Sequence, residues 1–202
     1  MTWVYTPMQF IEKIRRYIRI SEIAPISRRY FVMNAFDGAT TILGIVLGAY
    51  VAEISNESWV IWSGLGATLA MGLSGFVGAY MTEEAERERK LKTLERSMLK
   101  KLKKTVVGKA SRFASLWAAI VDGLSPAITA VVCLTPFFLS SCGLFSIDSA
   151  TKVSVAMALS IMFLLGVFLG KISNRNMLIH GIKTLSVGLI ITSILFMLKT
   201  IQ

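Results

Sequence analysis

The chain has 202 residues, of which 54% are hydrophobic and only 17% are charged, whereas a soluble domain has about 25% charged residues. Its 22 Lys and Arg residues outnumber its 12 Asp and Glu residues, which gives a formal net charge of +10. The charges are clustered, and the long uncharged stretches between the clusters exclude a soluble enzyme. They also exclude a nucleic-acid-binding protein, because the basic residues flank stretches long enough to cross a bilayer.

Five of these stretches predict membrane-spanning helices. Positions 58–82 hold 25 consecutive uncharged residues, and positions 153–170 hold 18. A bilayer core of about 30 Å needs roughly 20 apolar residues in a helix. The predicted spans are residues 30–52, 58–81, 113–140, 149–170 and 177–198. No span alternates apolar and polar residues as barrel strands do, so we predict an all-α bundle of five transmembrane helices.

The distribution of basic residues predicts the orientation in the membrane. Residues 1–29 hold six Lys and Arg residues, residues 82–112 hold eleven and residues 171–183 hold three, whereas the opposite side has two. Cytoplasmic loops of membrane proteins carry such an excess, so we expect a multi-pass protein of the cell membrane with a cytoplasmic N-terminus. The same bases attract the anionic lipids of the inner leaflet, and the net charge requires no nucleic acid.

The sequence predicts four consecutive parts. In residues 1–29, Tyr17 and Ile18 lie among basic residues, which predicts an amphipathic helix on the cytoplasmic membrane surface that ends near Pro25. Residues 30–81 contain the first two spans, residues 82–112 a short, charged cytoplasmic hairpin of helices, and residues 113–202 the last three spans. Neither Gly nor Pro separates the second span from the hairpin, so we expect one continuous helix there.

Two spans each contain one acid, Asp37 in the first and Asp122 in the third. At offsets of three, four and seven residues, both acids are followed by mainly small or polar residues: Thr40, Thr41 and Gly44 after Asp37, and Ser125, Pro126 and Thr129 after Asp122. These offsets place the residues on one face of each helix. The similarity suggests a parallel internal repeat, as in some transporters. Two short matches also arise by chance, so both explanations stay open.

An ionised Asp near the centre of a membrane helix costs about 2.5–3.5 kcal/mol, so such residues usually face a cavity or a partner. We therefore predict that Asp37 and Asp122 bind a divalent cation or carry protons. The alternative is that each carboxylate lies at the headgroups and pairs with an arginine. Arg29 and Arg112 precede these acids by eight and ten residues, about 12–15 Å along the same helix. This separation favours the functional interpretation.

Two other residues are candidates for the transport path. Pro126 cannot donate a backbone hydrogen bond, which frees the carbonyl of Asp122 as a further oxygen ligand; a simple packing kink is an equal alternative. The thioether of Met71 could contact a borderline-soft metal such as Fe(II), although Met is more often a packing residue. The many small residues of the second span, such as Gly72 and Gly75, allow close helix packing within the chain or across a homodimer.

Four acids begin the charged hairpin directly after the second span. They are Glu83, Glu84, Glu86 and Glu88. They could collect cations at the cytoplasmic entrance of a transport path. Alternatively, pairs at a spacing of four residues, such as Glu88 with Lys92, could lie on a solvated helix. The sequence shows no phosphate-binding glycine loop, Cys/His metal cluster or serine nucleophile, so we expect neither an enzyme nor a cofactor.

These residues resemble the vacuolar iron transporter family, in which the first span carries Asp-Gly preceded by Asn, as in Asn34…Asp37-Gly38 here. The family pattern Leu-Ser-Met…Gly-Glu-Tyr corresponds to residues 73–80, which read Leu-Ser-Gly-Phe-Val-Gly-Ala-Tyr. The family's methionine therefore falls on Gly75 and its glutamate on Ala79. The hairpin is also shorter than the family's cytoplasmic metal-binding domain, which is typical of a divergent prokaryotic member.

The resemblance implies export of Fe(II) or Mn(II) from the cytoplasm by proton antiport. It implies that Asp37 and Asn34 belong to the transport path, and that Glu88 begins a metal-collecting helix. Asp122 has no equivalent in the family motif and is a candidate replacement for a lost ligand. Residues Thr41, Met71 and Pro126 complete the predicted path. We expect divalent metal, protons, lipid and a second copy of the chain as partners.

One alternative is a membrane scaffold that transports nothing and whose basic hairpin binds lipid or a partner protein. An intramembrane aspartyl protease is a weaker alternative, because Asp37 and Asp122 lack the neighbours expected of such an enzyme.

Overall fold

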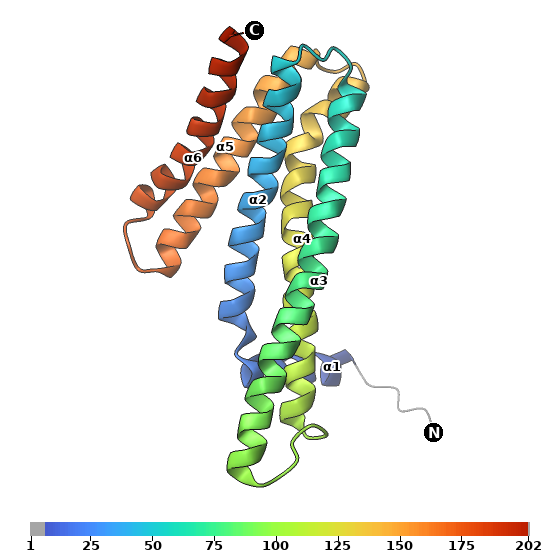
Figure 1. Ribbon diagram of the computed structural model, residues 1–202, viewed down its shortest axis with the longest axis vertical. Helices are drawn as coiled ribbons and strands as arrows, with labels where there is room; N and C mark the ends of the chain where they lie inside the picture. Colours follow the sequence, from blue (N-terminus) through green and yellow to red (C-terminus); the bar gives the residue numbers. More distant parts are fainter. Residues whose placement is uncertain (1–6, 202) are drawn as a thin grey trace. The chain divides into compact units, whose positions relative to one another are not determined.

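The computed structural model describes the backbone of residues 7–201 and their side chains except those of residues 7–11, 13 and 201. Residues 1–6 of the predicted N-terminal segment lie outside the described residues. Six helices follow one another along the chain (Figure 1): α1 (Pro7–Ser21), α2 (Ile23–Val51), α3 (Glu57–Met98), α4 (Val106–Ser141), α5 (Ile147–Ile172) and α6 (Met177–Ile201). The prediction of an all-α fold is confirmed for these residues.

Helices α2 to α6 are long and apolar enough to cross a membrane. Within their most apolar stretches, the buried share ranges from 50% in α4 down to 11% in α6. At least half of the residues in each apolar stretch are therefore not buried within the protein. Exposure of that extent is expected in contact with lipid and not with water. The prediction of a multi-pass membrane protein with five candidate spans is confirmed at this level.

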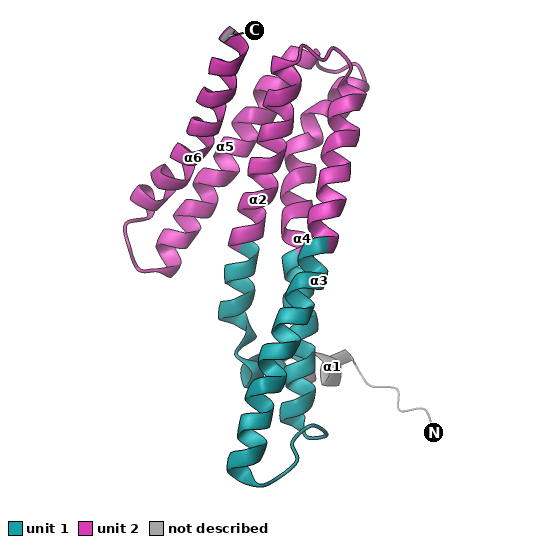
Figure 2. Ribbon diagram, viewed as in Figure 1, with its two compact units in different colours: residues 1–31, 74–122 teal, residues 32–73, 123–202 magenta. Residues whose placement is uncertain are grey.

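The chain forms two compact units (Figure 2). Unit 1 consists of residues 1–31 and 74–122, and unit 2 consists of residues 32–73 and 123–202. Helices α2, α3 and α4 each contribute to both units, whereas α5 and α6 belong to unit 2 alone.

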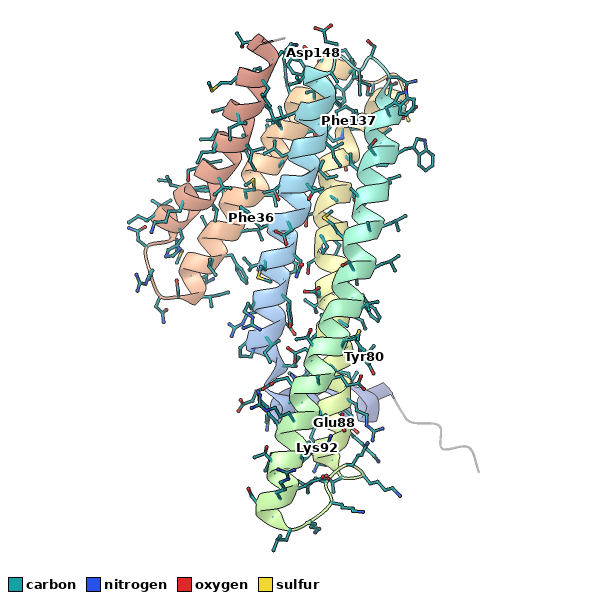
Figure 3. All side chains as sticks on the ribbon, in the orientation of Figure 1. Phe36, Tyr80, Glu88, Lys92, Phe137 and Asp148 are labelled. Atoms are coloured by element: carbon teal, nitrogen blue, oxygen red, sulfur yellow. The ribbon has the colours of Figure 1, made fainter. Side chains whose placement is uncertain are left out.

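Unit 2 has an apolar core of tightly packed side chains. Ile42 and Val46 of α2, Phe137 of α4 and Met162 of α5 are all buried in it (Figure 3 labels Phe137). Helices α5 and α6 lie side by side. They approach closely at Gly166, where a Cβ atom would lie 2.5 Å from the carbonyl oxygen of His180.

In unit 1, α1 and α2 are separate helices joined at Glu22, whose φ of 49° lies in the left-handed region. The predicted amphipathic helix is present, but the prediction that it ends near Pro25 was wrong: α1 ends at Ser21. Pro25 instead lies in the first turn of α2, where a missing N–H group breaks no helical hydrogen bond. Ile23 begins α2 and is buried with Ala114 and Ala118 of α4.

Helix α3 runs without interruption for 42 residues, which confirms that the second span continues into the hairpin. The turn after α3 begins at Leu99, whose φ is 50°. The Glu95 carboxylate accepts hydrogen bonds from the backbone N–H groups of Leu102 and Lys103, at 2.5 and 3.1 Å. Glu95 thereby fixes the path of the chain between α3 and α4.

Candidate functional site

Unit 2 contains most of the predicted transport-path residues. Asp37 lies on α2 with an exposed side chain. One turn further along, the Thr41 hydroxyl donates a hydrogen bond to the sulfur of Met71 on α3, at 3.3 Å. The structure therefore brings together Thr41 and Met71, which are 30 residues apart in the sequence. Thr41 thus lies one helical turn from Asp37, and the Met71 thioether contacts Thr41.

The backbones of α2 and α4 approach closely beside Asp37. A Cβ atom on Gly38 would lie 2.6 Å from the carbonyl oxygen of Pro126 and 2.8 Å from its Cα atom. Pro126 is fully buried, and Asn34 is partly buried one turn before Gly38. The glycine that follows the acid is therefore required by this helix crossing, and the predicted role of Pro126 as a ligand-bearing kink remains a prediction.

Asp122 belongs to unit 1 and has a different environment from Asp37. Its residue exposure is 6%. A Cβ atom on Gly75 of α3 would lie 2.6 Å from the Oδ2 atom of Asp122. The Asp122 carboxylate therefore occupies the space in which any side chain at position 75 would begin. Asp37 and Asp122 thus begin similar sequence patterns, but Asp37 is exposed and Asp122 is buried.

Glu83 is the buried member of the four acids in the hairpin, at 7% exposure. Its carboxylate accepts hydrogen bonds from the Tyr30 hydroxyl at 3.2 Å and from Arg87 Nε at 3.1 Å. The Nη1 atom of Arg87 donates to the carbonyl oxygen of Ser21 at the end of α1, at 3.3 Å. Glu83 thus belongs to a network that joins α1, α2 and α3 within unit 1.

The other three acids of the hairpin are exposed. Glu86 pairs with Lys90 at 3.4 Å. Glu88 pairs with Lys92 at 3.2 Å, and Figure 3 labels these two residues. The second pair is the one that the sequence predicts. Glu84 accepts a hydrogen bond from the Tyr80 hydroxyl at 3.2 Å. Exposed pairs of this kind contribute about 1 kcal/mol or less, so they leave the carboxylates available to other cations.

Among the side chains that the structure describes, no three or more His, Cys, Asp or Glu residues group together in a way that could hold a metal ion. The acids of the hairpin therefore act as separate charges in this structure. Sequence reasoning missed Arg87 and Tyr30, which hold Glu83. The spacing of four residues between Glu83 and Arg87 could have indicated the first partner, whereas no sequence signal indicates the second.

The contact between Gly75 and Asp122 yields a stability prediction. We expect Gly75→Ala to destabilise the protein by about 1–3 kcal/mol, because the new methyl group overlaps the buried carboxylate. Adding Asp122→Ala should remove the overlap, so the effects of the two substitutions should not be additive. Thermal unfolding in detergent of the two single variants and the double variant measures this coupling.

Gly78→Ala is the matched control on the same helix, because a Cβ atom at Gly78 would have nothing within 4 Å. Its unfolding temperature should not fall. Additive effects of Gly75→Ala and Asp122→Ala would contradict the contact.

Two comparisons with known proteins bear on these residues. The model of the VIT family matches residues 28–110, which include Asp37, the second span and all but the last two residues of the hairpin. An uncharacterised protein of Methanocaldococcus jannaschii is 37% identical over 174 residues, which cover 85% of this chain and 87% of the relative. The chain belongs to the VIT family. The resemblance seen in the sequence is confirmed, and the relative is an archaeal protein.

Membership of the VIT family makes this protein a relative of transporters and not of enzymes. The matched residues contain both the Asp37-Gly38 pair and the contact between Thr41 and Met71. Asp122 lies beyond the matched residues. Asp122 is thus outside the part of the chain that the family model matches, whereas the other buried acid, Glu83, lies within it.

Proposed function

We propose that this VIT-family protein exports a divalent metal cation, Fe²⁺ or Mn²⁺, from the cytoplasm across the cell membrane in exchange for protons. The observation that carries the proposal is Asp37, an acid with an exposed side chain within an apolar helix of the matched region. An ionised Asp within a membrane-spanning helix costs free energy, and binding of a cation can offset this cost.

The neighbours of Asp37 suit such a cation. A carboxylate is a hard oxygen ligand, whereas the thioether of Met71 is a soft sulfur ligand. Met71 contacts Thr41, one turn from Asp37. A site that uses both kinds of ligand favours Fe²⁺ over Mg²⁺ or Ca²⁺, because these two cations prefer oxygen alone.

A second copy of the chain would cover Asp37. Gly44 and Gly48 lie seven and eleven residues after Asp37 on the same face of α2, and a Cβ atom at either glycine would have nothing within 4 Å. Open small-residue faces of this kind allow helices of two protomers to approach closely. We therefore propose a homodimer in which this face of α2 is shared and Asp37 is removed from lipid.

The remaining acids receive separate roles in the proposal. Asp122 is buried, and we assign it to the exchange of protons or to a second ligand position. Three further acids are exposed: Glu84, Glu86 and Glu88. We assign them to attracting cations to the cytoplasmic entrance of the transport path. Glu83 is committed to Arg87 and Tyr30, so we assign it mainly to holding unit 1 together.

The test is metal flux in proteoliposomes that contain the purified protein. Fe²⁺ or Mn²⁺ should enter vesicles whose protein is inserted with its cytoplasmic side outward, and the internal pH should change with the flux. Flux of one ion with coupled proton movement supports the proposal and identifies the cargo. Absence of flux for both ions, from protein shown to be folded, would overturn it and favour the scaffold that binds lipid through its basic hairpin.

A further inference from the structure

Two tryptophans project from the first turns of α3 in unit 2. Trp59 and Trp62 are 67% and 72% exposed. On the opposite side of the same turns, Val60 and Ile61 are buried in the apolar core of unit 2. This burial fixes the direction of the two indoles, which point away from the core. Neither tryptophan belongs to the predicted transport path, so their exposure requires a separate explanation.

Both tryptophans lie at the end of a membrane span, on the side opposite the basic hairpin. Glu57 begins α3, and positions 58–82 hold no charged residue. Trp62 precedes Thr82, the last residue of this stretch, by 20 positions, which correspond to about 30 Å of helix. The hydrocarbon core of a bilayer is also about 30 Å thick. When Thr82 lies at the cytoplasmic edge of the core, Trp62 therefore lies at its outer edge, and Trp59 lies one turn further out.

An indole ring suits this level of the membrane. Its body is apolar, but its Nε1–H group donates a hydrogen bond. Trp is for this reason enriched where the hydrocarbon core meets the lipid headgroups. A second copy of the chain is a poorer cover for two such large rings, because closely packed membrane helices meet through small residues. The open glycines Gly44 and Gly48 of α2 provide a face of that kind, whereas this part of α3 does not.

The same face of α3 is purely apolar further into the membrane. Leu69 and Leu73 follow Trp62 at offsets of seven and eleven residues, and they are 66% and 67% exposed. These offsets place both leucines on the face of the tryptophans. Leucine along the span and tryptophan at its end is the order expected of a helix whose side contacts lipid chains and whose end contacts lipid headgroups.

We propose that Trp59 and Trp62 bind the outer lipid interface and thereby set the depth of the contact between Thr41 and Met71. Met71 follows Trp62 by nine residues, which correspond to about 13–14 Å of helix. Half of the hydrocarbon core is about 15 Å. The contact between the Thr41 hydroxyl and the Met71 sulfur therefore lies near the middle of the bilayer. The lipid contact of the tryptophans does not rest on metal export, since it follows from their exposure and their position in the span.

Tryptophan fluorescence in lipid nanodiscs tests the proposal. Two variants keep either Trp59 or Trp62 and carry Phe at the other three of the four tryptophan positions. Phosphatidylcholine brominated near the glycerol end of its acyl chains should quench both indoles more than phosphatidylcholine brominated near the chain ends. The matched control is Leu69→Trp in a chain whose native tryptophans are all replaced by Phe. Position 69 is exposed on the same face and about 10 Å deeper, so the order of quenching should reverse. Circular dichroism should show equal helix content in all three variants.

Three results would overturn the proposal. Absence of quenching of Trp59 and Trp62 by either lipid would show that protein, such as a second copy of the chain, covers them. Quenching by iodide as strong as that of free tryptophan would show that both indoles lie in water. The same order of quenching as in the Leu69→Trp control would place the span at a different depth. None of these results depends on whether the protein transports metal.

Discussion

Asp37→Asn is expected to reduce metal flux in proteoliposomes to the level of protein-free vesicles while the protein stays folded. Asn has nearly the same shape as Asp, but it carries no charge and exchanges no proton near neutral pH. Because Asp37 lies on an apolar helix, removing its charge lowers the cost of placing α2 in the membrane, whether its surroundings are lipid or a second copy of the chain. We therefore expect unchanged or higher thermal stability together with lost flux.

Asp148→Asn is the matched control. Asp148 lies in the first turn of α5, is exposed and pairs with Lys152 at 2.6 Å (Figure 3 labels Asp148). Loss of such a surface pair costs about 1 kcal/mol or less, and flux should be retained. Full flux in Asp37→Asn would exclude Asp37 from the transport path while leaving export itself in place. Absence of flux in the parent protein would instead contradict the proposed function.

The helices could be predicted from the sequence because hydropathy and charge alone determine which stretches cross a membrane. Their ends were less predictable. The first span was expected to begin at residue 30, but α2 begins at Ile23. Pro25 favoured a helix end in the sequence, yet a proline in a first turn breaks no hydrogen bond. The break occurs at Glu22 instead, and no sequence rule identifies a left-handed Glu.

The candidate site was predictable in its residues but not in their environments. Asp37 and Asp122 begin similar patterns, yet only Asp122 is buried. Which face of a helix is covered depends on its neighbours, and here Gly75 of α3 provides the space for the Asp122 carboxylate. Likewise, four acids follow one another in the hairpin, but only Glu83 is covered by packing in unit 1. Burial depends on tertiary contacts that local patterns do not contain.

Gly38→Ala is expected to have the largest effect on stability among alanine substitutions of the three glycines of α2, Gly38, Gly44 and Gly48. Its Cβ atom would lie 2.6 Å from the carbonyl oxygen of Pro126 and 2.8 Å from its Cα atom. Both atoms belong to the backbone of α4, so no side-chain rotation can relieve the overlap and the two helices must separate. Overpacking of this kind costs about 1–3 kcal/mol or more, which thermal unfolding in detergent will show as a lower midpoint.

Gly44→Ala separates this overlap from the general effect of the substitution. Nothing lies within 4 Å of a Cβ atom at Gly44, and Ala is favoured over Gly in a helix by about 1 kcal/mol. In protein that light scattering shows to be monomeric, the midpoint of Gly44→Ala should therefore stay or rise. Loss of the dimer in this variant would separately support the face proposed for it. Equal midpoints for the two variants would contradict the close crossing at Pro126. A lower midpoint for Gly38→Ala alone would mean that the glycine after Asp37 is required to hold α2 against α4. This conclusion does not depend on the function of Asp37.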